Sequence, residues 1–103
     1  MLLIDPTSGQ IIDANQAAAG YYGYARERLL GMAIQQINTL PPEEVRRQRE
    51  LAIAQRRNVF HFKHRLASGE VRDVDVFSTP FNRGDQQRLF SIVIDVADRH
   101  RSA

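Results

Sequence analysis

Two carboxylates that stand two residues apart, Asp73 and Asp75, are the side chains in this sequence whose types and spacing most resemble an acid/base pair. Residues two apart on a strand share a face, so the pair could in principle donate and accept protons at one site. Lys63 and Arg65 have the same spacing ten residues earlier. Opposite charges that face each other across two strands stabilise a sheet, so we interpret the carboxylates as salt-bridge partners.

His61 and His64 are the other candidates for chemistry. Residues three apart on a strand point to opposite faces, and the sequence suggests no third ligand, so we do not expect a zinc site. His64 alternates in step with Phe62 and Leu66, which places it on the apolar face. It could be a polar contact in an apolar ligand pocket, or a core histidine whose nitrogens bond to a backbone carbonyl or to water.

The segment Ser68–Gly69–Glu70 predicts the turn between these two strands. A turn of three residues would fix the register of the hairpin. The expected pairs are Ala67 with Val71, Arg65 with Asp73, His64 with Val74, Lys63 with Asp75, and Phe62 with Val76.

Composition limits the class of protein. The 103 residues are enough for one domain, and an apolar content of 43% indicates a globular one. The chain has no cysteine, which excludes disulfides, thiolate metal sites and a cysteinyl-flavin photosensor. Acidic and basic residues are interleaved at a net charge of +2, so we expect no nucleic-acid partner. No apolar run reaches the roughly 20 residues of a membrane span, and we expect a cytoplasmic location.

The hydropathy pattern changes along the chain from strands to helices and back to strands. Short strands are expected at 2–4 and 10–13, and alternation predicts three more strands, the first after Asn58, the second ending at Pro80 and the last over 89–96. Helical segments are expected in between, at 16–22 after the N-cap Asn15, at 26–30, at 34–37 and, the longest, from the two prolines at 41–42 to about Arg57, with its arginines in solvent. This order predicts an α+β fold with helices on one face of an antiparallel sheet.

Four segments in this order resemble PAS domains. They are Asp5–Gly9 with Ile12–Asn15, then Gly23–Tyr24 with Glu27–Gly31, then Phe62–Leu66 with Ser68–Val74, and finally Ile92–Arg99. The resemblance covers nearly the whole chain and implies a five-stranded antiparallel sheet with short helices and one longer helix on one face. It also implies a single PAS domain over 1–103 that begins after the usual lead-in helix, with 97–103 starting a linker to an effector domain. Ala97 stands where the family usually has threonine.

The resemblance implies a cavity between sheet and helices that either binds a small molecule or is filled by side chains. Haem-binding relatives place their histidine on the long helix, and 41–57 contains none, so we expect no haem. The pocket candidates are Tyr22, Ile37, Leu51, Phe62, His64, Val74, Val76, Ser91 and Val93.

The outer face of the sheet is the second candidate site. If Ser91 points inward, its neighbours in the last strand point outward and form an apolar patch, which marks a surface that another element covers. The candidates are Leu3, Phe77, Phe90, Ile92 and Ile94. A second copy of the chain or the lead-in helix could cover this patch, and we expect a homodimer.

The resemblance therefore implies a sensory or regulatory domain that binds a small ligand or mediates dimerisation, and relays a signal to a C-terminal effector such as a diguanylate cyclase or a histidine kinase. One alternative is a ligand-free protein-interaction module. Another is a small α+β cavity enzyme, but such an enzyme needs a titratable pair in the cavity, where only His64 is expected. We expect the chain itself to have no catalytic activity.

Overall fold

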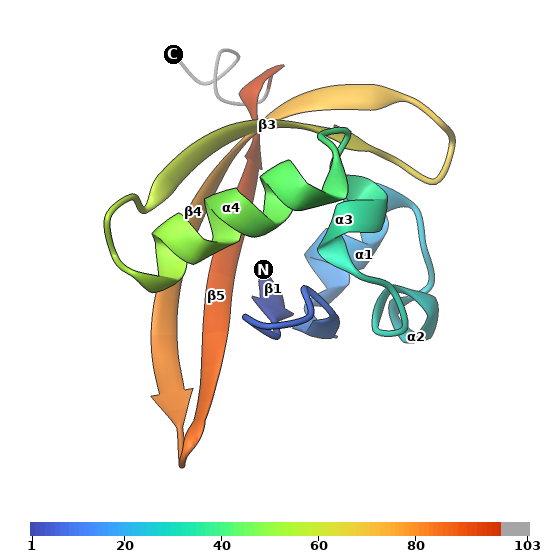
Figure 1. Cartoon of the computed structure of the whole chain (residues 1–103). Coiled ribbons are helices and arrows are strands. Elements are labelled where there is room, and N and C mark those ends of the chain that lie inside the picture. The colour runs from blue at the N-terminus through green and yellow to red at the C-terminus, as the bar shows by residue number, and fades with distance from the viewer. Residues whose placement is uncertain (98–103) are drawn as a thin grey trace.

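The computed structural model describes residues 1–97, which form five strands and four helices (Figure 1). In chain order these are β1 (Leu2–Ile4), β2 (Ile11–Ala14), α1 (Gln16–Tyr22), α2 (Arg26–Leu29), α3 (Ile34–Ile37), α4 (Pro42–Ile53), β3 (Val59–Arg65), β4 (Val71–Arg83) and β5 (Gln86–Asp95). The expected linker, 97–103, lies outside the described residues except for Ala97.

The strands form one antiparallel sheet in the order β2-β1-β5-β4-β3. The helices all lie on the same side of this sheet, and α4 runs across its concave face (Figure 1). The core lies between the two layers and includes buried residues from every strand and every helix. The α+β fold with a five-stranded sheet is the fold that the sequence predicted.

Local signals in the sequence explain the ends of α1. Asn15 is the N-cap, and its side chain accepts a hydrogen bond of 2.9 Å from the N–H of Ala18. Gly23 ends the helix at φ 82°, a left-handed conformation that glycine adopts at little cost, and its N–H donates to the carbonyl of Ala19. Both residues have the capping positions that the sequence predicted.

Helix α4 is shorter than the sequence suggested, because it ends at Ile53 instead of near Arg57. Gln55 adopts φ 56°, and the N–H of Arg56 donates to the carbonyl of Leu51 at 3.0 Å. These are features of a Schellman turn, which usually has glycine at the left-handed position. Glutamine gave no such signal in the sequence.

The register of the β3–β4 hairpin differs by two residues from the predicted one. Arg65 pairs with Val71, so that Lys63 faces Asp73, whereas Arg65 had been expected to face Asp73. The turn is longer than three residues because the N–H of Ala67 donates to the carbonyl of Tyr22 at 2.7 Å, which removes Ala67 from the strand ladder. In the observed register Phe60 faces Val76, Phe62 faces Val74, and His64 faces Arg72. A shift of two residues preserves the face of every side chain.

The β4–β5 hairpin extends well beyond the rest of the sheet (Figure 1). Pro80 does not end β4 as predicted, but pairs with Leu89 inside a ladder that continues to Arg83 and Gln86. Strand β3 begins at Val59, opposite Phe77, so β4 has an open edge at Pro80. Proline is tolerated on an open edge, where its missing N–H has no strand partner.

Candidate functional site

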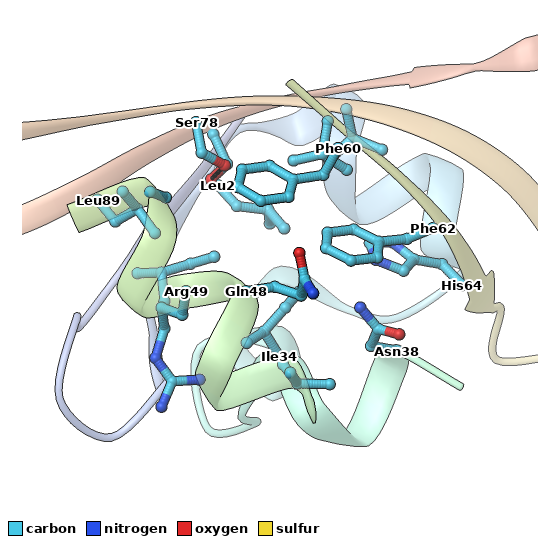
Figure 2. A pocket seen from close by; sticks show the side chains of 16 residues that line it. Leu2, Ile34, Asn38, Gln48, Arg49, Phe60, Phe62, His64, Ser78 and Leu89 are labelled. Carbon is cyan, nitrogen blue, oxygen red and sulfur yellow. Dashed lines mark hydrogen bonds between the residues drawn. The ribbon is translucent and has the colours of Figure 1, made fainter. Parts of the chain in front are cut away.

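A cavity lies between α3, α4 and the concave face of the sheet (Figure 2). Its volume is about 40 Å³, which is enough for a water molecule but much less than the roughly 150 Å³ of an engineered cavity that holds benzene. Five of the nine predicted pocket residues line it, and these are Phe62, His64, Val76, Ser91 and Val93.

The other four predicted pocket residues do not line the cavity. Tyr22, Ile37 and Val74 are fully buried in the core beside it. Leu51 is only partly buried. The side of α4 that faces the cavity carries Val45, Gln48, Arg49 and Ala52 instead. The remaining lining residues were not among the predicted set, and they are Leu2, Ile4, Ile34, Asn38, Val45, Gln48, Arg49, Ala52, Phe60, Ser78 and Leu89.

His64 is 1% exposed and points to the concave side, as strand alternation predicted, whereas His61 is exposed on the other side. The hydroxyl of Tyr22 on α1 lies 2.8 Å from Nδ1 of His64. Among the described residues, Nε2 of His64 has no hydrogen-bond partner. Burial lowers the pKa of His64 to about 4, so the ring is neutral near pH 7.

Three rings of β3 form one wall of the cavity. Phe60 and Phe62 have parallel ring planes, 6° apart, with centroids separated by 5.5 Å. Phe62 and His64 are also nearly parallel, at 11° and 5.9 Å. The period-two pattern of the sequence placed all three on one face, and a wall of parallel rings suits contact with a flat apolar group.

Arg49 on α4 was expected in solvent with the other arginines, and this expectation was wrong. It is 8% exposed, its Nε donates to the carbonyl of Pro6 at 3.0 Å, and its Nη2 donates to that of Thr7 at 3.2 Å. The aliphatic part of the side chain lines the cavity, while the guanidinium turns away from it (Figure 2). Arg49 therefore fastens α4 to the β1–β2 turn.

Small polar groups complete the cavity. The hydroxyls of Ser78 and Ser91 lie 2.9 Å apart, which joins the inner faces of β4 and β5. The amides of Asn38 and Gln48 project from the helical side towards the ring wall (Figure 2). Alternation along β4 and β5 would have found Ser78, and the spacing from Val45 and Ala52 places Gln48 on the inner stripe of the long helix. Nothing in the sequence distinguished Asn38 from a surface residue.

Asp73 and Asp75 lie on the face of the sheet opposite to the cavity. Lys63 Nζ lies 2.8 Å from Asp73 Oδ1, and His61 Nδ1 lies 3.0 Å from Asp75 Oδ1. The hydrogen bond from Lys63 and its positive charge hold the pKa of the Asp73 carboxyl below its usual value. Asp73 therefore has a cross-strand salt bridge, as interpreted from the sequence, but with Lys63 in place of Arg65, while Asp75 contacts His61 in place of Lys63.

The convex face carries an apolar row that crosses three strands. Val59, Phe77 and Ile92 are opposite one another in register and are 41%, 38% and 45% exposed. Val59 was not among the predicted interface residues. Phe90 and Ile94 are half-buried. Leu3 is 7% exposed, because it pairs with Asp13 on one side and Phe90 on the other, so it adds little to the exposed surface.

Asp95 joins three elements where β5 ends. Its carboxylate accepts hydrogen bonds from Arg72 on β4 and from the hydroxyl of Tyr21 on α1, the latter at 2.6 Å. The N–H of Ala97 donates to the same carboxylate at 2.8 Å. Desolvation raises the pKa of Asp95, but the bonds from Arg72, Tyr21 and Ala97 outweigh it and lower the pKa to about 2.

Within residues 1–97 we find no group of three or more side chains that could hold a metal ion. No helix in that range is long and apolar enough to span a membrane.

A sheet that encloses an apolar cavity with helices on its concave side defines a class of small ligand-binding or protein-binding domains. Comparison with known families identifies the class: residues 2–101 match the family model of the PAS fold, and the chain belongs to this family. PAS domains are sensory modules of signal-transduction proteins.

The chain is similar to PAS domains of known structure. One comes from Desulfitobacterium hafniense, with a TM-score of 0.84 and 21% identity over 91% of this chain and 89% of that one. Another belongs to an HTR-like protein of Haloarcula marismortui, with a TM-score of 0.81 and 24% identity over 91% of this chain and 78% of that one. These similarities support the fold.

The chain is also 33% identical, over 98% of its length, to the diguanylate cyclase DgcM of Escherichia coli strain K12. It spans only 25% of the length of that relative. The similarity therefore concerns one segment of a longer protein.

Proposed function

We propose that this chain is the sensory PAS module of a longer signalling protein, and that a C-terminal diguanylate cyclase is its effector. The observation that carries the proposal is the 33% identity to a quarter of a diguanylate cyclase, over 98% of this chain. The proposal includes a cytoplasmic location. The chain itself would regulate and not catalyse.

The site suggests how a signal would leave the module. A ligand in the cavity would contact His64, which Tyr22 connects to α1. The neighbouring residue of α1, Tyr21, bonds to Asp95, and Asp95 also holds the backbone of Ala97. Occupancy of the cavity could thus change the balance between two arrangements of the C-terminal end, provided that the ligand binds one of them more tightly.

The convex face would serve for dimerisation. The exposed row of Val59, Phe77 and Ile92 lies on the side of the sheet opposite to the helices. Burial of apolar area stabilises association by about 25 cal/mol per Å² before the costs of binding are subtracted. A second copy of the chain is the proposed partner. The lead-in helix expected from the family resemblance is the alternative cover for this row.

A domain exchange in DgcM tests the proposal. The matching segment of the Escherichia coli cyclase is replaced by this chain, and cyclic di-GMP is measured in cells and with the purified chimera. We expect a folded chimera that retains cyclase activity, and a loss of activity when the whole module is deleted. A folded chimera whose activity is unaffected by deletion of the module would contradict the regulatory role.

One observation favours a second candidate, a module that binds proteins and no small ligand. The cavity of about 40 Å³ is nearly filled by side chains. In that case substitutions on the convex face would alter the output of the chimera, while substitutions in the cavity would alter only its stability.

A further inference from the structure

We propose that the cavity accepts an uncharged, single-ring molecule that carries one hydrogen-bond acceptor, and that Nε2–H of His64 donates to this acceptor. This inference rests on the proposed sensory function. It adds the chemical class of the ligand and the atom that selects it.

The protonation of His64 follows from the needs of two buried groups. The hydroxyl of Tyr22 is 0% exposed, and among the described residues its hydrogen-bond partner is Nδ1 of His64. If Nδ1 carried the ring proton, the hydroxyl hydrogen of Tyr22 would be buried without an acceptor, which costs about 1–3 kcal/mol. The tyrosine therefore donates to Nδ1, and the neutral ring has its proton on Nε2.

That proton has no acceptor among the described residues, because Nε2 of His64 is buried and unpaired. A buried donor without a partner is destabilising, and a ligand that supplies a carbonyl, ether or ring nitrogen removes this penalty. A ligand that offers only donors or only carbon atoms leaves it in place. The cavity should thus discriminate between ligands by whether they carry an acceptor.

The charges around the cavity exclude charged ligands. Among the described residues, the polar lining consists of uncharged amides, hydroxyls and the neutral ring of His64, with Arg49 as the one exception. The guanidinium of Arg49 is turned towards the carbonyls of Pro6 and Thr7 and away from the cavity (Figure 2). An ion would lose its hydration here without gaining a counter-charge, and such burial is costly.

The shape of the cavity favours a flat ring. The rings of Phe60 and Phe62 line the β3 side with parallel planes, and a flat ring can be added parallel to them. The amide of Gln48 faces this surface from α4 (Figure 2), and its Nε2 also donates to Glu44 at 2.8 Å. Because about 40 Å³ is too small for a ring, the side chain of Gln48 must move outward when one binds.

Four probes of nearly equal size test the ligand class, and these are acetophenone, isopropylbenzene, benzoate and benzylammonium. Binding to the chain and to its Gln48→Ala variant is followed by the amide shifts in ¹H–¹⁵N NMR spectra. We expect acetophenone to bind at least tenfold more tightly than each of the others, and Gln48→Ala to bind it more tightly than the native chain does. Equal or tighter binding of isopropylbenzene or of either ion, or no binding of any probe to Gln48→Ala, would overturn the inference.

Two further measurements address His64 itself. The ¹⁵N shifts of its ring nitrogens should report a proton on Nε2, and a proton on Nδ1 would overturn the proposal without any need for a variant. In His64→Leu, acetophenone should bind about as weakly as isopropylbenzene. The control is Tyr21→Phe, which changes the residue next to Tyr22 and should leave the preference for acetophenone over isopropylbenzene intact. An unchanged preference in a folded His64→Leu variant contradicts the role of Nε2.

The ligand class and the proposed function can fail separately. If the cyclase chimera is unregulated but acetophenone binds with the expected selectivity, the sensory role is wrong and the ligand class stands. If the chimera is regulated but the chain binds all four probes equally tightly, the sensory role stands and the ligand class is wrong.

Discussion

Arg72 on β4 donates hydrogen bonds from both Nε and Nη2 to the two carboxylate oxygens of Asp95 on β5, at 3.0 and 3.1 Å. The two residues are not opposite each other in the ladder, where Asp95 faces Val74. The contact is thus a diagonal, bidentate ion pair, and bidentate pairs of arginine and carboxylate form strong hydrogen bonds. The side chain of Asp95 is 2% exposed, whereas the side chain of Arg72 is 33% exposed.

Asp95→Asn should destabilise the domain by about 2 kcal/mol, because hydrogen bonds to a charged group contribute about 1.5–3 kcal/mol. The pKa of Asp95 is lowered to about 2 in the folded state, so its stabilising effect is present above the unfolded pKa near 4. The effect is lost as pH falls through 4 to 2, because the unfolded state then binds the extra proton. Urea unfolding at pH 7 and pH 3 measures both effects.

The control for this variant is Asp73→Asn on the outer face. Asp73 is 47% exposed and pairs with Lys63, and exposed ion pairs contribute about 0–1 kcal/mol. If Asp73→Asn lowers the free energy of unfolding as much as Asp95→Asn does, the buried hydrogen bonds of Asp95 have no special stabilising effect.

A second prediction concerns His64 and pH. Desolvation lowers the folded pKa of His64 to about 4, below the unfolded value of 6.5. The neutral ring therefore stabilises the fold fully above pH 6.5, and the stability falls as pH drops from 6.5 towards 4, since the unfolded chain takes up the proton first. Between pH 7 and pH 5 the free energy of unfolding should fall by about 2 kcal/mol.

Denaturant titrations of His64→Leu and His61→Gln at the same two pH values isolate this effect. His64→Leu should lose most of the pH dependence between 7 and 5, while His61→Gln, at an exposed site, should retain it. The same slope in His64→Leu as in the native chain would mean that another group is responsible.

Strand alternation was sufficient to assign faces, but it could not fix the pairs of residues across the hairpin. Lys63 and Arg65 are both cations, so the charges alone fit either of two registers. The choice depends on Ala67, whose N–H bonds to Tyr22 on a distant helix. A contact between residues so far apart in the sequence has no local signal, and the predicted register was therefore wrong while the faces were right.

The cavity was predicted less completely on its helical side than on its sheet side. On the strands, period two placed Phe62, His64 and Ser91 on the inner face. On α4, the five consecutive polar residues 46–50 separate Val45 from the apolar residues 51–53, so the inner stripe had few apolar markers. Arg49 is buried only because the β1–β2 turn offers it two carbonyls, which no helical pattern reveals.

A third prediction addresses that arginine. Arg49→Met keeps an unbranched apolar stem at the cavity but removes both bonds to the turn, and we expect the free energy of unfolding to fall by about 1–3 kcal/mol. Arg46→Met changes an exposed arginine of the same helix and should alter it by no more than about 0.5 kcal/mol. Thermal and urea unfolding of both variants makes the comparison. Equal effects would show that the buried bonds of Arg49 contribute nothing specific.

The last prediction concerns the apolar row on the convex face. Ile92 is its most exposed member at 45%. It lies opposite Phe77, which is the central residue of the row. If a second copy covers this row, Ile92→Glu places two carboxylates in the interface, where burial of unpaired charge is costly. The dimer should then dissociate at least tenfold more readily, which sedimentation velocity over a range of concentrations measures. Gln16→Glu, an exposed change at the start of α1 on the helical side, should leave the dimer intact. The circular dichroism of both variants should match that of the native chain, because Ile92 lies outside the core cluster. A native chain that remains monomeric at high concentration, or a dimer that tolerates Ile92→Glu, would show that the convex face is not where two copies meet.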